Sequence, residues 1–299
     1  MRRLPELIAI SIFVATSLLA ILVSWVLNTQ EGVQGASSNT QSTLYIVLFL
    51  VLTLIFSAGI LYFARKRGMR IIRAVFIIIS IYVVFVVSLP LSFLIVNGLN
   101  YVVPLSDLVA YTMLYGIWFA IPVYMAWALI FRPEWYVVDA LGILLSVGLS
   151  AIWGITLNAW FSVALLSIFA VYDYIAVYRT KHMVDLADTS IKSGMPMLFF
   201  IPERRGIKMK DVSIEQGRKG TETMLLGYGD IALPSIMVVS SARLGNFAIF
   251  PFVVLPIVGA VIGMIILFAF ARKPAPGLPF INSGVILGFL FSVVISMSL

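Results

Sequence analysis

Long apolar stretches separated by short polar segments make up most of this 299-residue chain. Each stretch holds about the 20 residues that a helix needs to cross a bilayer, so the pattern predicts nine membrane-spanning helices. The predicted spans cover residues 4–27, 44–63, 71–96, 105–131, 135–153, 159–178, 221–241, 247–270 and 279–299. We therefore expect an amino-terminal membrane part at 1–178, an inside polar loop at 179–220 and a carboxy-terminal membrane part at 221–299.

The composition agrees with this pattern and excludes several kinds of catalytic site. Hydrophobic residues account for 62% of the chain and charged residues for 11%, whereas soluble domains carry about 25% charged residues. Backbone groups in hydrocarbon must bond to each other, so we predict an all-α polytopic membrane fold. The chain has no cysteine, and its single histidine, His182, lies in the charged loop. Thiol and Ser-His catalysis are thereby excluded, and we expect no metal and no cofactor.

The distribution of basic residues predicts the orientation of the chain in the membrane. With the amino terminus inside and the carboxy terminus outside, nineteen of the 20 Lys and Arg fall in inside segments, and only Arg243 lies outside. This asymmetry follows the positive-inside rule and supports nine spans. It also explains the net charge of +7 by contact with anionic lipid headgroups, so we expect no nucleic-acid partner.

Two aspartates lie well inside strongly apolar runs, Asp173 in the sixth span and Asp230 in the seventh. A carboxylate at such a position costs about 3 kcal/mol on insertion scales, so it is interpreted as functional. At 1.5 Å per residue, Asp173 lies roughly 8 Å and Asp230 roughly 12 Å from the inside boundary. Because the two spans are consecutive and antiparallel, the two acids can face each other.

Two adjacent carboxyl groups provide the parts for peptide hydrolysis. One keeps a proton while the other is a base, because both cannot ionise cheaply at close range. The base takes a proton from a shared water and the acid polarises the peptide carbonyl. Gly227 and Gly229 leave room for substrate or water beside Asp230, and Tyr172 can donate a hydrogen bond. Helix packing for the glycines and core packing for the tyrosine remain open alternatives.

Three short motifs occur in a characteristic order: Tyr172-Asp173 in span six, Gly227-Tyr228-Gly229-Asp230 in span seven, and Pro276-Gly277-Leu278-Pro279 before span nine. The chain resembles the presenilin and signal peptide peptidase family, whose motifs are YD, GxGD and PAL, over nearly its whole length.

The resemblance implies an intramembrane aspartyl protease that cleaves helices of single-span membrane proteins, signal-peptide remnants included. It makes Asp173 and Asp230 the catalytic pair and places Pro276, Gly277 and Leu278 near the substrate. Gly277 stands where the family usually has alanine. The inside amino terminus matches the presenilin orientation, and the absence of extensions indicates a stand-alone prokaryotic or archaeal relative in the cell membrane. A homo-oligomer is left open.

Two other classes of function use buried acids. A proton- or cation-coupled transporter or channel could use the same pair as a proton relay. Transporters more often show internal repeats, which are not evident in this sequence. The second alternative is a structural subunit with acids buried for packing.

Two further features have competing interpretations. For Asp139 we favour an interfacial role or a helix cap over catalysis. For the apolar patch at 195–202 we favour a loop anchor at the membrane interface over an edge that meets a substrate.

Overall fold

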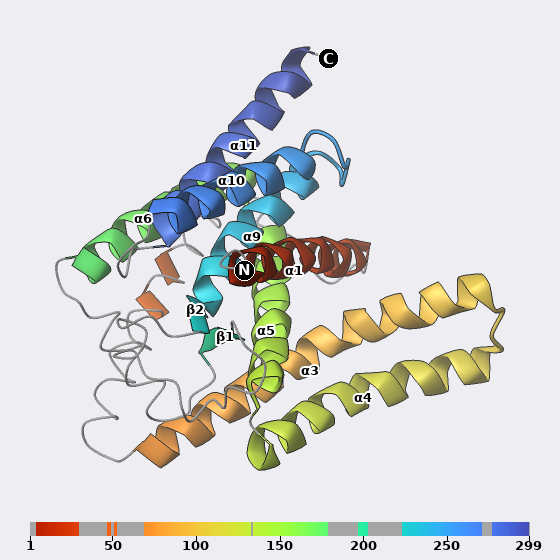
Figure 1. Ribbon diagram of the computed structural model, residues 1–299. Helices are drawn as coiled ribbons and strands as arrows, with labels where there is room; N and C mark the ends of the chain where they lie inside the picture. The colour runs from red at the N-terminus through yellow and green to blue at the C-terminus, as the bar shows by residue number, and fades with distance from the viewer. Residues whose placement is uncertain are drawn as a thin grey trace.

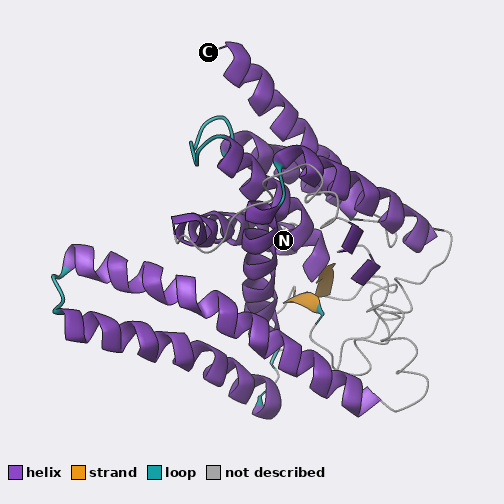
Figure 2. Cartoon of the chain, turned by 180° about the vertical axis from the view of Figure 1, so that it is seen from behind, coloured by secondary structure: helices purple, strands orange, loops and turns teal. Residues whose placement is uncertain are grey.

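The computed structural model describes residues 4–29, 47–48, 51–52, 69–132, 134–178, 197–202, 223–270 and 277–298. Within these parts of the chain it contains eight α-helices and a two-stranded sheet (Figures 1 and 2). The helices are α1 (Leu4–Thr29), α3 (Met69–Val102), α4 (Asp107–Phe131), α5 (Trp135–Thr156), α6 (Ala159–Tyr178), α9 (Tyr228–Leu244), α10 (Val254–Phe270) and α11 (Leu278–Ser298). The strands are β1 (Leu198–Pro202) and β2 (Thr223–Gly227).

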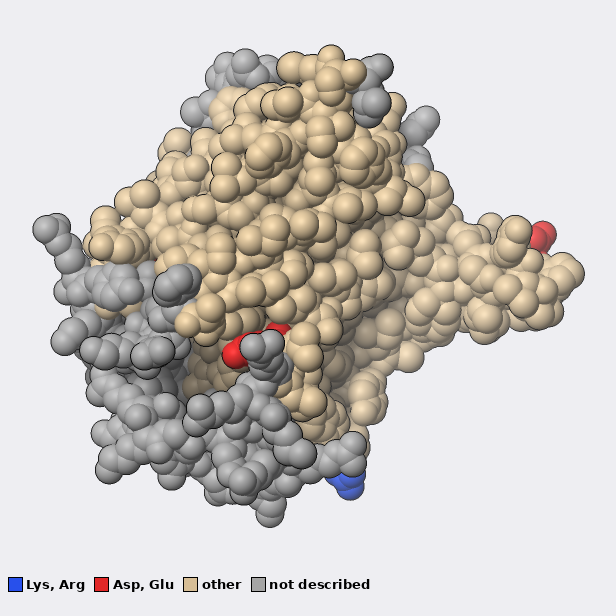
Figure 3. Space-filling view, turned by 45° about the horizontal axis from the view of Figure 1, so that its top comes forward, with Lys and Arg blue, Asp and Glu red and all other residues tan. Residues whose placement is uncertain are grey.

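Six of the described helices, α1, α3, α4, α5, α6 and α11, are long and apolar enough to cross a membrane. The described surface seen in Figure 3 carries few charged atoms, as expected for an integral membrane protein. Eight of the nine predicted spans correspond to a helix in the described part of the chain. The second predicted span, at 44–63, lies almost wholly outside the described residues, as does the polar loop at 179–220 apart from 197–202.

Helix α5 stands at the centre of the molecule, with α9 beside it and α1 crossing both (Figure 1). Helices α6, α10 and α11 lie on one side, and the α3–α4 hairpin extends away on the other (Figures 1 and 2). Small hydroxyl side chains permit close approach of membrane helices and add hydrogen bonds between them. The buried bonds of this kind among the described helices are Ser150 to the carbonyl of Ala232 (2.9 Å), Ser240 to the carbonyl of Gly154 (3.1 Å), Ser17 with Ser235 (2.9 Å) and Ser162 with Ser240 (2.8 Å).

Helices α10 and α11 touch backbone to backbone through glycines. Each helix carries two glycines four residues apart, Gly259 and Gly263 on α10, and Gly284 and Gly288 on α11. A Cβ added to Gly284 would strike the carbonyl oxygen of Gly259, and the reverse also holds. This small-residue pattern is typical of tightly packed membrane helices, and it fixes the position of α11 relative to α10.

The two strands form an antiparallel hairpin in which Leu198 pairs with Gly227 and Phe200 with Leu225. Aromatic and branched residues of β1 favour an extended chain, and Phe199, Phe200 and Ile201 are at most 2% exposed. The interpretation of this patch as an interfacial anchor is therefore wrong, because it packs inside the molecule. The all-α prediction is confirmed for most of the described spans but missed this sheet, whose second strand lies at the start of the seventh predicted span.

Candidate active site

Asp173 lies on the buried face of α6. Buried positions on this helix recur every three or four residues, namely Ser162, Leu165, Leu166, Phe169, Asp173 and Ala176. This spacing places the aspartate on the same helical face as the apolar core residues. Its side chain is 4% exposed, and its Oδ2 accepts a hydrogen bond of 3.2 Å from the backbone N–H of Leu278. The start of α11 therefore holds this carboxyl group.

Asp230 lies in the first turn of α9, directly after β2. Its Oδ2 accepts a hydrogen bond of 3.2 Å from the backbone N–H of Gly227, the residue before the helix. A carboxylate is favoured at this place, because the first N–H groups of a helix lack partners within the helix. The prediction of a helix running from residue 221 is thus wrong at its start, since residues 223–227 form β2.

The two acids meet at the first residues of α11. Asp173 binds the N–H of Leu278, while a Cβ built on Gly277 would lie 3.3 Å from Cγ and Oδ1 of Asp230. Two consecutive residues therefore contact one carboxyl group each, and the two acids interact electrostatically. Acidic atoms are visible in a recess of the surface in Figure 3. The arrangement therefore places both carboxyl groups beside the start of α11.

The other site residues predicted from the sequence are Gly229, Tyr172 and Pro276. Gly229 faces open space where a side chain would stand, which leaves room beside Asp230. Tyr172 is 37% exposed, and its ring lies edge-on to Phe169 with 6.5 Å between ring centroids. Phe169 shares a hydrophobic cluster with Leu278, so Tyr172 borders the site. Pro276 lies outside the described residues.

Helix α5 carries contacts to the site that were not predicted. The hydroxyl of Tyr228 donates a 2.7 Å hydrogen bond to the carbonyl of Val138, and Asp139 accepts one of 2.7 Å from the N–H of Phe200. Asp139 is 9% exposed and lies beyond the first turn of α5, so the helix-cap interpretation is wrong, while its interfacial depth stays a prediction. Side chains at Gly142 would strike the rings of Tyr228 and Phe199. In the sequence, Gly142 was the one sign of this contact, because a glycine permits another segment to pack closely against α5.

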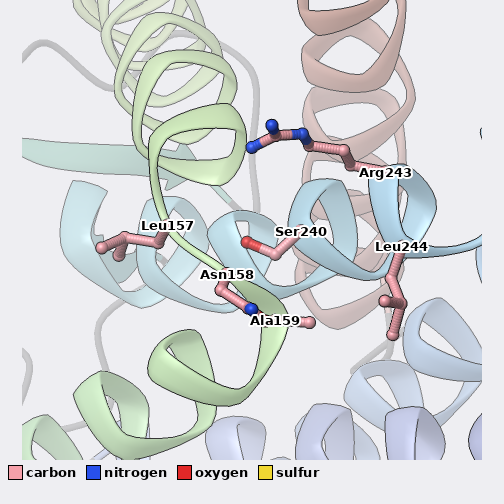
Figure 4. Close-up of a pocket in the computed structure, with 6 residues that line it drawn as sticks. All are labelled: Leu157, Asn158, Ala159, Ser240, Arg243 and Leu244. Atoms are coloured by element: carbon pink, nitrogen blue, oxygen red, sulfur yellow. The ribbon is translucent and has the colours of Figure 1, made fainter. Parts of the chain in front are cut away.

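A separate cavity of about 270 Å³ lies at the other end of α9. The residues that line it come from the α5–α6 link and the last turns of α9, and they are Leu157, Asn158, Ala159, Ser240, Arg243 and Leu244 (Figure 4). The guanidinium of Arg243 points toward α5 in Figure 4 and donates to the carbonyl of Ile155. It satisfies a carbonyl at the end of α5, where cations are favoured. Among the described residues, no group of three or more His, Cys, Asp and Glu could hold a metal ion.

Comparison with known proteins identifies the family of the chain. The family model described as signal-peptide peptidase, presenilin aspartyl protease matches residues 10–298. A solved structure of a presenilin family intramembrane aspartate protease in space group C222 aligns with a TM-score of 0.63 and 27% identity, over 99% of this chain and 100% of that chain. A structure from the same family in space group P2 aligns with a TM-score of 0.59 and 28% identity, over 95% and 96%. Comparison with curated proteins gave no match.

Proposed function

The chain belongs to the signal-peptide peptidase and presenilin aspartyl protease family, and on that premise we propose that Asp173 and Asp230 are its catalytic pair. Members of this family and the aligned structures are intramembrane aspartyl proteases, so this protein is a protease that acts on membrane proteins within the bilayer. Neither comparison supports a transporter or a channel.

The observation that carries the catalytic assignment is the convergence of both acids on Gly277 and Leu278. A pair of carboxyl groups that share one proton can act as base and acid in the same step. The ionised carboxylate takes a proton from water, and the water oxygen attacks the carbonyl carbon of the peptide. The protonated carboxyl group gives its proton to the carbonyl oxygen. The resulting tetrahedral diol then collapses: the carboxyl group that is now protonated gives its proton to the leaving amine, and the carboxylate takes a proton from a diol hydroxyl, which restores the pair.

The residues around the pair orient the carboxyl groups. The N–H of Leu278 fixes Asp173, and the N–H of Gly227 fixes Asp230. Holding the reacting groups in place lowers the entropic part of the barrier. Because the two acids titrate as one unit, neither is assigned a separate role as acid or base.

We further propose the nine-span topology with the amino terminus inside, single-span proteins or peptides as substrates, and the cell membrane of a prokaryote as the location. The positive-inside distribution of Lys and Arg supports the topology. The length of the described helices supports the membrane location. Both acids lie in one chain, so the catalytic proposal does not require an oligomer.

The test is cleavage of a single-span peptide by the purified protein in liposomes. Asp173→Asn and Asp230→Asn are each expected to abolish cleavage, because either change removes one carboxyl group and keeps its shape. Asp107→Asn is the matched control, since Asp107 is an exposed acid in the first turn of α4. Cleavage by either variant of the pair would contradict the assignment, as would the absence of cleavage by the unaltered protein.

A further inference from the structure

Apart from the two acids of the candidate site, Asp139 is the one acid among the described residues that is buried, at 9% exposure. It lies on α5, and its Oδ1 accepts the hydrogen bond from the N–H of Phe200 in the middle of β1. Burying a carboxyl group in an apolar environment is costly unless it is hydrogen-bonded. The protease reaction as proposed above does not use this acid, so its burial requires another explanation.

The geometry of the hairpin explains which group Asp139 binds. The N–H of Tyr228 donates to the carbonyl of Met197 at 3.4 Å, which makes these two residues a hydrogen-bonded pair. Bonded and non-bonded pairs alternate along an antiparallel ladder, so Phe200 and Leu225 form a non-bonded pair. The N–H of Phe200 therefore points away from β2, toward α5. Without Asp139 it would be a buried donor with no partner in the sheet.

The turn of α5 that carries Asp139 also contacts the junction between β2 and α9. The hydroxyl of Tyr228 bonds the carbonyl of Val138, next to Asp139. The rings of Tyr228 and Phe199 lie edge-on with centroids 4.7 Å apart, over the space left by Gly142. Asp230 follows Tyr228 by two residues, so the seating of the hairpin on α5 sets the position of the Asp230 carboxyl group.

We propose that Asp139 is a positioning residue for proteolysis, which seats the β1–β2 hairpin on α5 and thereby places Asp230 opposite Asp173. This inference rests on the proposed catalytic pair. The carboxyl group acts as a hydrogen-bond acceptor for Phe200 and touches no reacting atom. A small displacement of a catalytic group can lower the rate by about 100-fold, so the effect should appear in the catalytic step.

The experiment compares Asp139→Leu with Asp139→Asn. Leucine removes the acceptor at similar volume and is expected to lower kcat by about 10- to 100-fold, the range set by a lost charged hydrogen bond and a displaced carboxyl group. KM should change by less than about threefold, because the loss falls on the transition state. Asparagine keeps an acceptor oxygen, so kcat should recover to within about threefold of the unaltered protein. Asp107→Leu is the control, since it removes an exposed acid.

Amide hydrogen exchange gives a second measurement that does not depend on the variants. In the unaltered protein, the amide of Phe200 should be as strongly protected as the ladder amides of β1, although it has no partner in β2. Fast exchange there would overturn the inference, as would an Asp139→Asn variant as slow as Asp139→Leu or a leucine variant with normal kcat. The catalytic proposal fails separately, if Asp173→Asn or Asp230→Asn still cuts. The two failures are therefore distinguishable.

Discussion

The backbone N–H of Leu278 donates a hydrogen bond of 3.2 Å to the carboxyl group of Asp173, 105 residues earlier in the chain. The contact uses the main chain, so the side chain of Leu278 is free to pack, and it is 4% exposed in a cluster with Leu165 and Phe169. The motif before the last helix therefore has two separable roles, a backbone donor for an acid and an apolar contact with α6.

Leu278→Pro tests the donor. Leu278 is the first residue of α11, where proline is compatible with a helix but lacks an N–H. We expect about a 10- to 150-fold loss of kcat, because a hydrogen bond to a charged group, worth about 1.5–3 kcal/mol, is removed. Leu278→Ala is the matched control, since it loses the same apolar contacts and keeps the donor. Equal kcat values for the two variants would contradict a role for the N–H.

Gly277 limits the space beside Asp230. A Cβ there would lie 3.3 Å from the carboxyl carbon, so alanine fits if the side chain of Asp230 shifts by a few tenths of an ångström. We expect Gly277→Ala to keep kcat/KM within about threefold, whereas Gly277→Val should lower it by about 100-fold by displacing the carboxyl group. Steady-state cleavage of one peptide measures both. A valine variant with normal kcat/KM would show that the residue lies farther from the reaction.

Gly284→Ala is expected to lower the thermal stability of the protein in detergent. The added methyl group would meet the backbone of α10, and such overpacking costs about 1–3 kcal/mol. The control is Gly116→Ala in α4, where a Cβ has no neighbour within 4 Å and alanine is the better helix former. The melting temperature should therefore fall for the first variant and remain equal or rise for the second.

Asn282 sets the register between α11 and α6. Its side-chain N–H donates a hydrogen bond of 2.9 Å to the carbonyl of Leu166, and the side chain is fully buried. Asn282→Leu should cost about 0.5–2 kcal/mol of stability, as for other hydrogen bonds between membrane helices. It should also lower kcat, because Asp173 and Leu278 meet across the same two helices. Ser283→Ala is the control, since that hydroxyl bonds within its own helix. Lower stability with unchanged kcat would show that register does not control the site.

The sequence predicted the membrane helices well and the surroundings of the acids less well. The bounds of α6 were predicted because its apolar run, in which Asp173 is the single charged residue, ends at basic residues. The start of α9 was mispredicted, since the sequence pattern of a short apolar run such as Thr223–Gly227 does not distinguish a strand from a helix. The strand state depends on pairing with Leu198–Pro202, which follows a polar segment and could not be aligned with β2 by sequence pattern alone.

The role of Asp139 could not be predicted for the same reason. An acid four residues into a predicted span resembles an ordinary interfacial residue. The N–H group that binds Asp139 belongs to β1 and reaches it only in the folded protein. The order of the motifs was more informative. It indicated that Asp173, Asp230 and Gly277 belong together, and in the structure Asp173 bonds Leu278 while Asp230 lies beside Gly277.

The glycine contact packs the backbones of α10 and α11 closely against each other, so we expect the two helices to move together. A parting of α6 from α11 would then displace α10 as well. Such a parting also withdraws the Leu278 amide from Asp173. With Asp173 in the proposed catalytic pair, we expect a molecule that is open between these helices to be inactive until they close again.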